Sequence, residues 1–153
     1  MRAGRWSLES FLFVVAVSLL AVSPAHAAVS CHKINAKGVG QDLGGGMTQA
    51  QIVGGGLLNG TTQGNFVATG GSPTVPSIAG TVTFTTDQAT LTVTVAGTLN
   101  LSTGEFMTSG PVTAATGKLA GATGTLVLNG IEDLTSGKFI EDISGLICVD
   151  LAP

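Results

Sequence analysis

Acidic side chains near the C-terminal end of the chain are the main candidates for chemistry. In the segment 137–149 apolar residues recur at alternate positions, and the same period would place Glu141 on their face of a strand. A carboxyl group in an apolar interior has a raised pKa and can act as a general acid or base. We expect instead a β-bulge at Glu141 and Asp142 that turns both side chains outward. No catalytic residue is therefore assigned. Glu141 would become a candidate catalytic residue only if its side chain pointed inward.

The same acidic residues could also supply oxygen ligands to Ca²⁺. Glu132, Asp133, Glu141 and Asp142 flank one expected turn, and Ca²⁺ takes several such ligands. Their spacing matches no calcium-binding loop. We therefore expect solvated charges that discourage association between sheet edges, and we assign neither a metal nor a cofactor.

The chain contains two cysteines, Cys31 and Cys148, and His32 follows the first of them. In an oxidising compartment two cysteines without another partner are expected to form one disulfide. These three residues are too few for a four-ligand zinc site. A Cys–His nucleophile pair is also unfavourable, because neighbours in an extended segment point to opposite faces. The prediction is a Cys31–Cys148 disulfide, with His32 as a surface or packing residue.

The N-terminus has the three-part layout of a secretory signal peptide. Arg2 and Arg5 precede an apolar run over 11–22, which is followed by Ala25-His26-Ala27. The run is shorter than the roughly 20 residues that a membrane-spanning helix needs. A membrane anchor and a lipid attached at Cys31 are the alternatives. We predict a signal peptide over 1–27 with cleavage after Ala27, a single domain over 28–153, and a secreted or periplasmic location without a stable membrane span.

Composition narrows the partners of residues 28–153. This part has no Arg, Trp or Tyr, and it carries four lysines against eight acidic residues. Without a basic stripe for phosphates or large aromatic rings for bases, nucleic-acid binding is excluded. Charged residues make up only 10% of the chain, against 23 glycines and many threonines. The surface should therefore consist mainly of hydroxyl and backbone groups.

Apolar residues alternate with threonine over 81–85 and again over 90–95, which predicts two half-buried strands. No segment has a sustained helical period. Further turn signals place strands at about 50–58, 64–70, 79–86, 89–101, 104–110, 124–133 and 137–149, with a short one near 112–116 and a loop or bent strand over 30–49. Closure removes sheet edges that few charges protect. The predicted fold is all-β, a single closed antiparallel β-barrel of about eight strands, wide enough for side chains or one small ligand.

A short pattern of Gly, a polar residue and Phe occurs three times, at 64–66, 104–106 and 137–139. We expect each glycine to adopt a positive φ in a hairpin turn, and each phenylalanine to enter the core.

The run TGKLAGATGT at 116–125 resembles the glycine-rich signature of the allene oxide cyclase and dirigent-like barrels, and of small secreted bacterial proteins that carry the same run. Its signature positions are Gly117, Leu119, Gly121 and Gly124. The resemblance implies an eight-stranded barrel, often dimeric or trimeric, whose pocket in the plant enzymes steers a hydrophobic intermediate. No catalytic residue carries over, since residues 28–153 lack the Arg and Tyr of dirigent pockets. A cyclase-like carboxylate would have to come from Glu105, Glu132 or Glu141.

The leading functional prediction is a non-catalytic secreted barrel that binds a small apolar ligand or assembles with itself at the cell surface, as a homo-oligomer. A cyclase-like or dirigent-like enzyme and a purely structural envelope protein are the alternatives. An inward Glu141 beside a cavity would favour the enzyme, whereas a barrel filled by its own side chains would favour the structural role.

Overall fold

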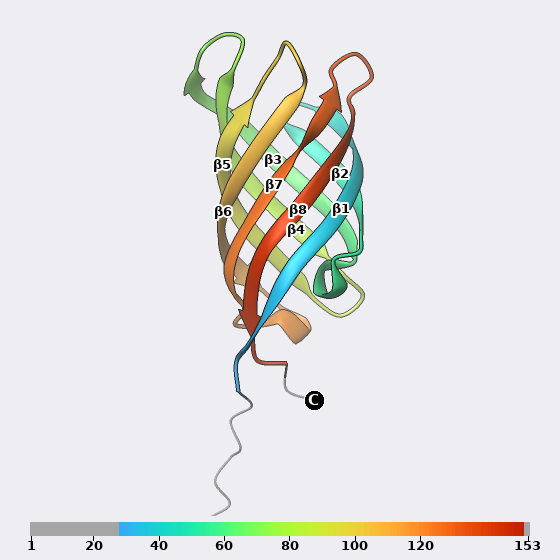
Figure 1. The fold of residues 1–153 in the computed structure, drawn as a ribbon, viewed down its shortest axis with the longest axis vertical. Coiled ribbons are helices and arrows are strands. Elements are labelled where there is room, and N and C mark those ends of the chain that lie inside the picture. Colours follow the sequence, from blue (N-terminus) through green and yellow to red (C-terminus); the bar gives the residue numbers. More distant parts are fainter. Residues whose placement is uncertain (1–27, 152–153) are drawn as a thin grey trace, which may run out of the picture.

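The computed structural model describes residues 28–151, so the predicted signal peptide lies outside the described residues. They form one closed antiparallel β-barrel in which each strand pairs with the next and the last pairs with the first (Figure 1). The strands are β1 (Ser30–Gly44), β2 (Met47–Val53), β3 (Gly60–Gly71), β4 (Pro76–Thr85), β5 (Thr90–Leu99), β6 (Glu105–Ala115), β7 (Thr123–Asp133) and β8 (Lys138–Val149). The prediction of a single eight-stranded barrel is confirmed.

Two of the predicted strands differ from the structure. The strand expected over 50–58 ends at Val53, and the short strand expected near 112–116 is the end of β6. The segment 30–49, expected to be a loop or a bent strand, contains β1, whose pairing with β2 shifts between Asp42 and Gly44, and the start of β2. The glycines of β1 are unusual in a strand, so the sequence alone did not indicate a regular strand here. Positions 38 and 40 are glycine because side chains of β8 occupy the space that a larger side chain would need.

Alternation in β4 and β5 divides apolar from hydroxyl side chains, as predicted. Val82 and Val93 are buried inside the barrel, whereas the threonines point outward and bond one another across strands. The hydroxyl oxygens of Thr83 and Thr92 lie 3.0 Å apart, and those of Thr94 and a threonine of β6, Thr113, lie 3.1 Å apart. Hydroxyl pairs thus replace ions on this part of the surface.

The apolar core fills the end of the barrel where β2–β3, β4–β5 and β6–β7 connect, which we call the closed end. Two short 3-10 turns, η1 (Gly56–Leu58) and η2 (Gly117–Leu119), lie across it (Figure 1). Leu58 and Leu119 project from these turns into the core and are 0% and 2% exposed. The described residues nearest both chain ends also lie here, so the opposite end, the open end, is formed only by hairpin connections.

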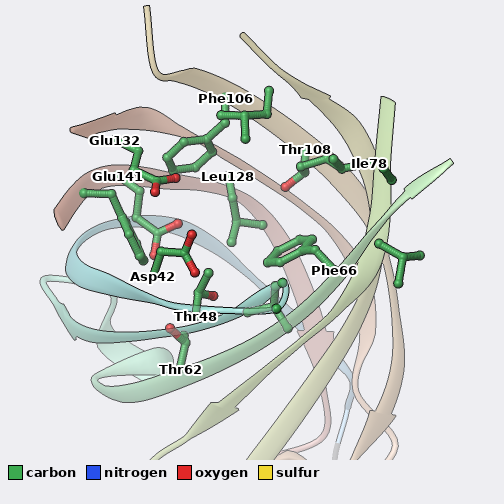
Figure 2. Close-up of a pocket in the computed structure, with 17 residues that line it drawn as sticks. Asp42, Thr48, Thr62, Phe66, Ile78, Phe106, Thr108, Leu128, Glu132 and Glu141 are labelled. Atoms are coloured by element: carbon green, nitrogen blue, oxygen red, sulfur yellow. The ribbon is translucent and has the colours of Figure 1, made fainter. Parts of the chain in front are cut away.

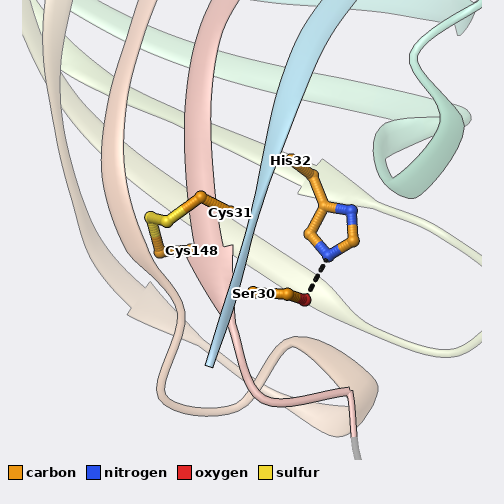
Figure 3. The surroundings of a disulfide bond; sticks show 4 residues. All are labelled: Ser30, Cys31, His32 and Cys148. Atoms are coloured by element: carbon orange, nitrogen blue, oxygen red, sulfur yellow. Dashed lines mark hydrogen bonds between the residues drawn. A yellow bond between two sulfur atoms is a disulfide. The ribbon is translucent and has the colours of Figure 1, made fainter. Parts of the chain in front are cut away.

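A disulfide joins the first and last strands where the barrel closes. Cys31 of β1 and Cys148 of β8 are a directly facing pair in the ladder, 117 residues apart in sequence, and their sulfurs are bonded (Figure 3). The predicted disulfide is confirmed. The side chain of His32 lies on the other face of β1, where its Nε2 is 2.8 Å from the hydroxyl of Ser30. This separation contradicts a Cys–His nucleophile pair.

Candidate functional site

A cavity of about 470 Å³ occupies the open end of the barrel. It lies beside the β1–β2 turn and the outer ends of β5 and β7, at the opposite end from η1 and η2. Its wall is mostly apolar, with three hydroxyls and three carboxyl groups among the side chains (Figure 2). The lining consists of Asp42, Gly45, Gly46, Thr48, Thr62, Phe66, Val67, Ala68, Ile78, Val82, Leu99, Phe106, Thr108, Leu128, Glu132, Phe139 and Glu141.

The aromatic part of the wall comes from the three repeats of Gly, polar residue and Phe. Phe66, Phe106 and Phe139 all line the cavity, and Phe139 is buried. The rings of Phe106 and Phe139 meet edge to face, with centroids 5.9 Å apart. The predicted inward direction of all three rings is confirmed.

The glycines of these repeats follow the prediction at two places and depart from it at the third. Gly104 and Gly137 have positive φ values of 76° and 72° beside the hairpin turns. Gly64 lies inside β3 without a positive φ, so the expected turn there is wrong. Glycine is needed at this position for another reason. A Cβ on Gly64 would lie 2.6 Å from the ring of Phe66, so a larger residue would displace the ring.

Glycines of neighbouring strands leave room for the other two rings. Phe139 of β8 lies over Gly40, its partner in β1, and Phe106 of β6 lies over Gly130, its partner in β7. A Cβ on Gly130 would lie 2.7 Å from the ring carbon Cζ of Phe106. Paired glycines thus let the aromatic rings lie close to the barrel wall and leave the centre of the open end unfilled.

Glu141 points into the cavity from β8, which corrects the expected orientation. Its side chain is 8% exposed, and β8 keeps an unbroken register with both β1 and β7 around it. There is no β-bulge at Glu141 and Asp142, and strict alternation therefore turns Glu141 inward and Asp142 outward. Within the described residues the carboxyl group of Glu141 makes no hydrogen bond to the protein. Burial raises the pKa of Glu141 to about 7.

Two further carboxyl groups lie on the same side of the cavity, those of Asp42 and Glu132 (Figure 2). Asp42 comes from β1 and accepts a hydrogen bond from the backbone N–H of Gly44 at 2.7 Å. Glu132 lies near the end of β7, and its pKa is raised, first by burial and then by the negative charge of Asp42. Among residues 28–151, no Lys, Arg or His lines the cavity. The three acids therefore face the cavity without a cationic partner in its wall.

The remaining acids lie outside the cavity. Asp142 forms a surface ion pair with Lys37, with Nζ and Oδ1 2.7 Å apart. Asp133 accepts hydrogen bonds from Ser136 and Thr135 in the β7–β8 turn, which lower its pKa. Glu105 is exposed and accepts a hydrogen bond from the Thr103 hydroxyl at 3.1 Å. The prediction of solvated edge charges is wrong for Glu141, whereas Glu132 is half-buried near the end of β7.

No group of three or more metal-ligating side chains within residues 28–151 is placed to hold a metal ion. The three cavity acids thus line one side of a ligand-sized space without converging on a single point. Their arrangement suits an extended organic molecule better than a bare ion.

The glycine-rich signature lies at the closed end, away from the cavity. Gly117, Gly121 and Gly124 have positive φ values of 60°, 77° and 143°, and Leu119 between them is a core residue. A Cβ on Gly117 would clash with the backbone carbonyl of Gln88. The signature therefore shapes the η2 turn that seals the barrel, and it contributes nothing to the cavity wall.

Sequence reasoning missed Asp42, Thr62 and Thr108 as cavity residues. Asp42 falls in the segment for which no regular strand was expected. Thr62 and Thr108 are 4% and 3% exposed, which is unusual among threonines that elsewhere face solvent. The period of the strands around them was the one signal that could have assigned them to the inner face.

Fold and site together define an eight-stranded antiparallel barrel with a plugged end and an open, acidic, largely apolar cavity. Comparison with protein-family models, with curated proteins and with solved structures found no significant match. Within residues 28–151, none of the helical segments has the length and apolar character to cross a membrane.

Proposed function

We propose that the protein binds a small apolar ligand in the cavity at the open end of its barrel. The observation that carries this proposal is the cavity itself. Its volume of about 470 Å³ falls in the range of ligand sites in proteins, roughly 300–1,000 Å³. Its wall combines Phe, Val, Ile and Leu side chains with a few polar groups, which is the usual composition of such sites.

A purely structural role fits this barrel less well. The apolar core is concentrated at the closed end, where Leu58 and Leu119 seal it, and the open end keeps its space unfilled. A barrel needed only as a building block gains stability by filling that space, since unfilled volume forfeits packing contacts. The resemblance to allene oxide cyclase and dirigent-like barrels agrees with a ligand in the cavity. The Cys31–Cys148 disulfide agrees with the proposed secreted or periplasmic location.

Self-association remains an alternative that one surface feature supports. Val39, Ile140 and Ile131 are neighbours across β1, β8 and β7, and they are 64%, 59% and 47% exposed. Such a row of apolar side chains on the outer wall is a feature of surfaces that bind other proteins. Sedimentation velocity of the protein and of Ile140→Lys tests this, because a homo-oligomer built on the row would dissociate in the variant.

The inward Glu141 favours a second candidate function, a cyclase-like or dirigent-like enzyme. A carboxyl group with a pKa near neutrality can donate or accept a proton within an apolar pocket. Shape would position the ligand, and Glu141 would be the acid or base. Proton exchange into a bound ligand, lost in Glu141→Gln while binding persists, would separate this candidate from a binding protein.

Binding is tested with N-phenyl-1-naphthylamine, an uncharged apolar dye that fluoresces when it leaves water. Residues 28–153 contain no Trp or Tyr, so the protein's own fluorescence does not interfere. We expect saturable binding with one site per chain. Thr108→Phe, which fills the cavity, should weaken binding at least ten-fold. Ser109→Phe is the matched control, since Ser109 is the next residue and is exposed. Absence of dye binding, or equal binding in both variants, would overturn the proposal.

A further inference from the structure

The cavity combines three acids that have no cationic partner in its wall with three phenylalanines, and this combination bears on the charge of its ligand. We propose that the ligand is a small organic cation, an amine with an apolar body, whose ammonium group binds at Glu141. This inference rests on the proposed ligand-binding function and names its ligand class.

The first step of the argument is the state of Glu141. Its side chain is 8% exposed, points into the cavity, and has no hydrogen-bond partner among the described residues. A buried carboxylate without a partner is costly, and natural proteins pair such groups with a counter-charge or a hydrogen-bond donor. The only ion pair within the described chain joins Lys37 to Asp142 on the outer surface. No described side chain therefore balances a charge on Glu141, and a counter-charge would have to come from a molecule in the cavity.

The second step is the sign of the surrounding charge. Asp42 and Glu132 face the same side of the cavity, and no basic side chain in the described part of the chain lines it. An anionic ligand such as a fatty acid would meet carboxyl groups of like charge there, and an uncharged ligand would leave their charge without a counter-charge. A primary or quaternary ammonium group beside Glu141 gains from that carboxylate directly and from the other two acids at longer range.

The third step is the aromatic wall. Phe106 lies near Glu141, and Phe66 is a further ring of the lining (Figure 2). Phe139 precedes Glu141 by two residues on the inner face of β8 and packs against Phe106. Aromatic faces attract organic cations as well as apolar bodies. Carboxylates together with aromatic rings form the usual environment of bound ammonium groups, whereas a bare metal ion finds no convergent ligand set in the described chain.

Three probes of one shape test the proposal, namely 3-phenylpropylamine, 3-phenylpropan-1-ol and 3-phenylpropanoate. Their affinities are measured by calorimetry at about pH 8, where the amine is protonated and Glu141 is ionised. The protein is obtained by expressing the full chain and purifying it in oxidised form. We expect the ammonium probe to bind roughly ten-fold or more tightly than the alcohol, and the carboxylate probe to bind more weakly than the alcohol.

Variants test whether Glu141 is the residue that causes the preference for the ammonium probe. Glu141→Gln should reduce ammonium affinity to about that of the alcohol while leaving alcohol affinity within about three-fold. Asp142→Asn is the matched control, because it removes the same charge at the next position but from the outer surface. It should change ammonium affinity by less than about two-fold. Glu132→Gln should give a smaller loss of the same sign as Glu141→Gln.

The outcomes separate this inference from the function on which it rests. Equal affinity for the ammonium and alcohol probes would overturn the cation proposal and leave apolar ligand binding intact. An ammonium preference that survives Glu141→Gln would overturn the role of Glu141. Failure of all three probes, and of the uncharged dye, would overturn the proposed function itself.

Discussion

Gly38 of β1 lies directly opposite Glu141 of β8, and the missing side chain of the glycine is what lets the carboxyl group lie against the barrel wall. A Cβ on Gly38 would lie 2.6 Å from both Cγ and Oε1 of Glu141. Gly130 of β7 faces Glu141 from the other side. The acid at the centre of the candidate site is thus held in a slot between two glycines.

We predict that Gly38→Ala destabilises the protein by about 1–2 kcal/mol, because the new methyl group displaces the Glu141 side chain. The cost should fall by about 1 kcal/mol in a Glu141→Ala background, where the displaced atoms are absent. A double-mutant cycle by urea unfolding measures this coupling. Gly80→Ala is the control, since its Cβ would meet the backbone of Asn65 and its cost should be the same in either background. Additive costs for Gly38 and Glu141 would contradict the slot.

Stability should decrease with rising pH because of Glu141. Its pKa is about 7 in the folded protein and near its ordinary value of 4.5 in the unfolded chain. Between these values the folded state keeps a proton that the unfolded state releases, so the free energy of unfolding falls as pH rises and levels off above about pH 7. The total loss is about 3 kcal/mol.

Glu141→Gln isolates this contribution in urea unfolding measured from about pH 4 to pH 8. The acids that face Glu141, namely Asp42 on β1 and Glu132 on β7, remain in the variant. As pH rises, the raised pKa of Glu132 also lowers the free energy of unfolding, and the lowered pKa of Asp133 increases it. Only the difference between wild-type protein and Glu141→Gln therefore reports the contribution of Glu141. Asp142→Asn should keep the pH dependence of the unchanged protein. An unaltered pH dependence in Glu141→Gln would show that the carboxyl group is not buried.

Loss of the disulfide should destabilise the barrel strongly. Cys31 and Cys148 join strands that are 117 residues apart in sequence, and a cross-link over such a length stabilises by about 4–5 kcal/mol in the chain-entropy model. The double variant Cys31→Ser/Cys148→Ser should therefore have a free energy of unfolding lower by about this amount, measured by urea unfolding. Reduced wild-type protein is the control and should have the same urea midpoint as the double variant. A difference below about 1 kcal/mol would mean that the β1–β8 ladder closes the barrel without help.

The glycine-rich signature should affect stability and leave binding unchanged. Leu119→Ala removes a core side chain that is 2% exposed and should cost about 2–5 kcal/mol. Gly117→Ala should also destabilise, because its φ of 60° is unfavourable for alanine and its Cβ would clash with Gln88. Dye affinity at low temperature, where both variants are folded, should match that of the unchanged protein. Weaker binding by the folded variants would place the signature in the ligand site.

The strand pattern was predictable wherever local chemistry and tertiary environment agreed. Threonine alternates with Val, Leu and Phe in β4 and β5, and turns follow where glycine and polar residues gather. β1 was not predictable in the same way. Its glycines weaken a strand locally, and only the side chains of β8, packed over Gly38 and Gly40, explain why they are there.

The candidate site was also predictable in part from local sequence and in part only from the tertiary structure. The repeated Gly, polar residue and Phe pattern predicted three inward rings, and period two alone indicated an inward Glu141. Choosing between that orientation and a bulge required the ladder on both sides of β8, which is unbroken. The local sequence could not predict that Asp42 and Glu132 lie on the same side of the cavity, because β8 lies between their strands, β1 and β7, in the barrel.

Sequence by itself determined the all-β class, because apolar residues alternate with threonine, and the pairing of the cysteines, because the chain has only two of them. It also determined the inward direction of the phenylalanines, because the pattern of Gly, polar residue and Phe repeats. Only the tertiary structure decided that one end of the barrel is plugged and the other hollow, and that an unpaired acid faces the hollow. These features depend on which side chains meet across strands far apart in sequence, where a glycine on one strand makes room for a large or charged side chain on the next.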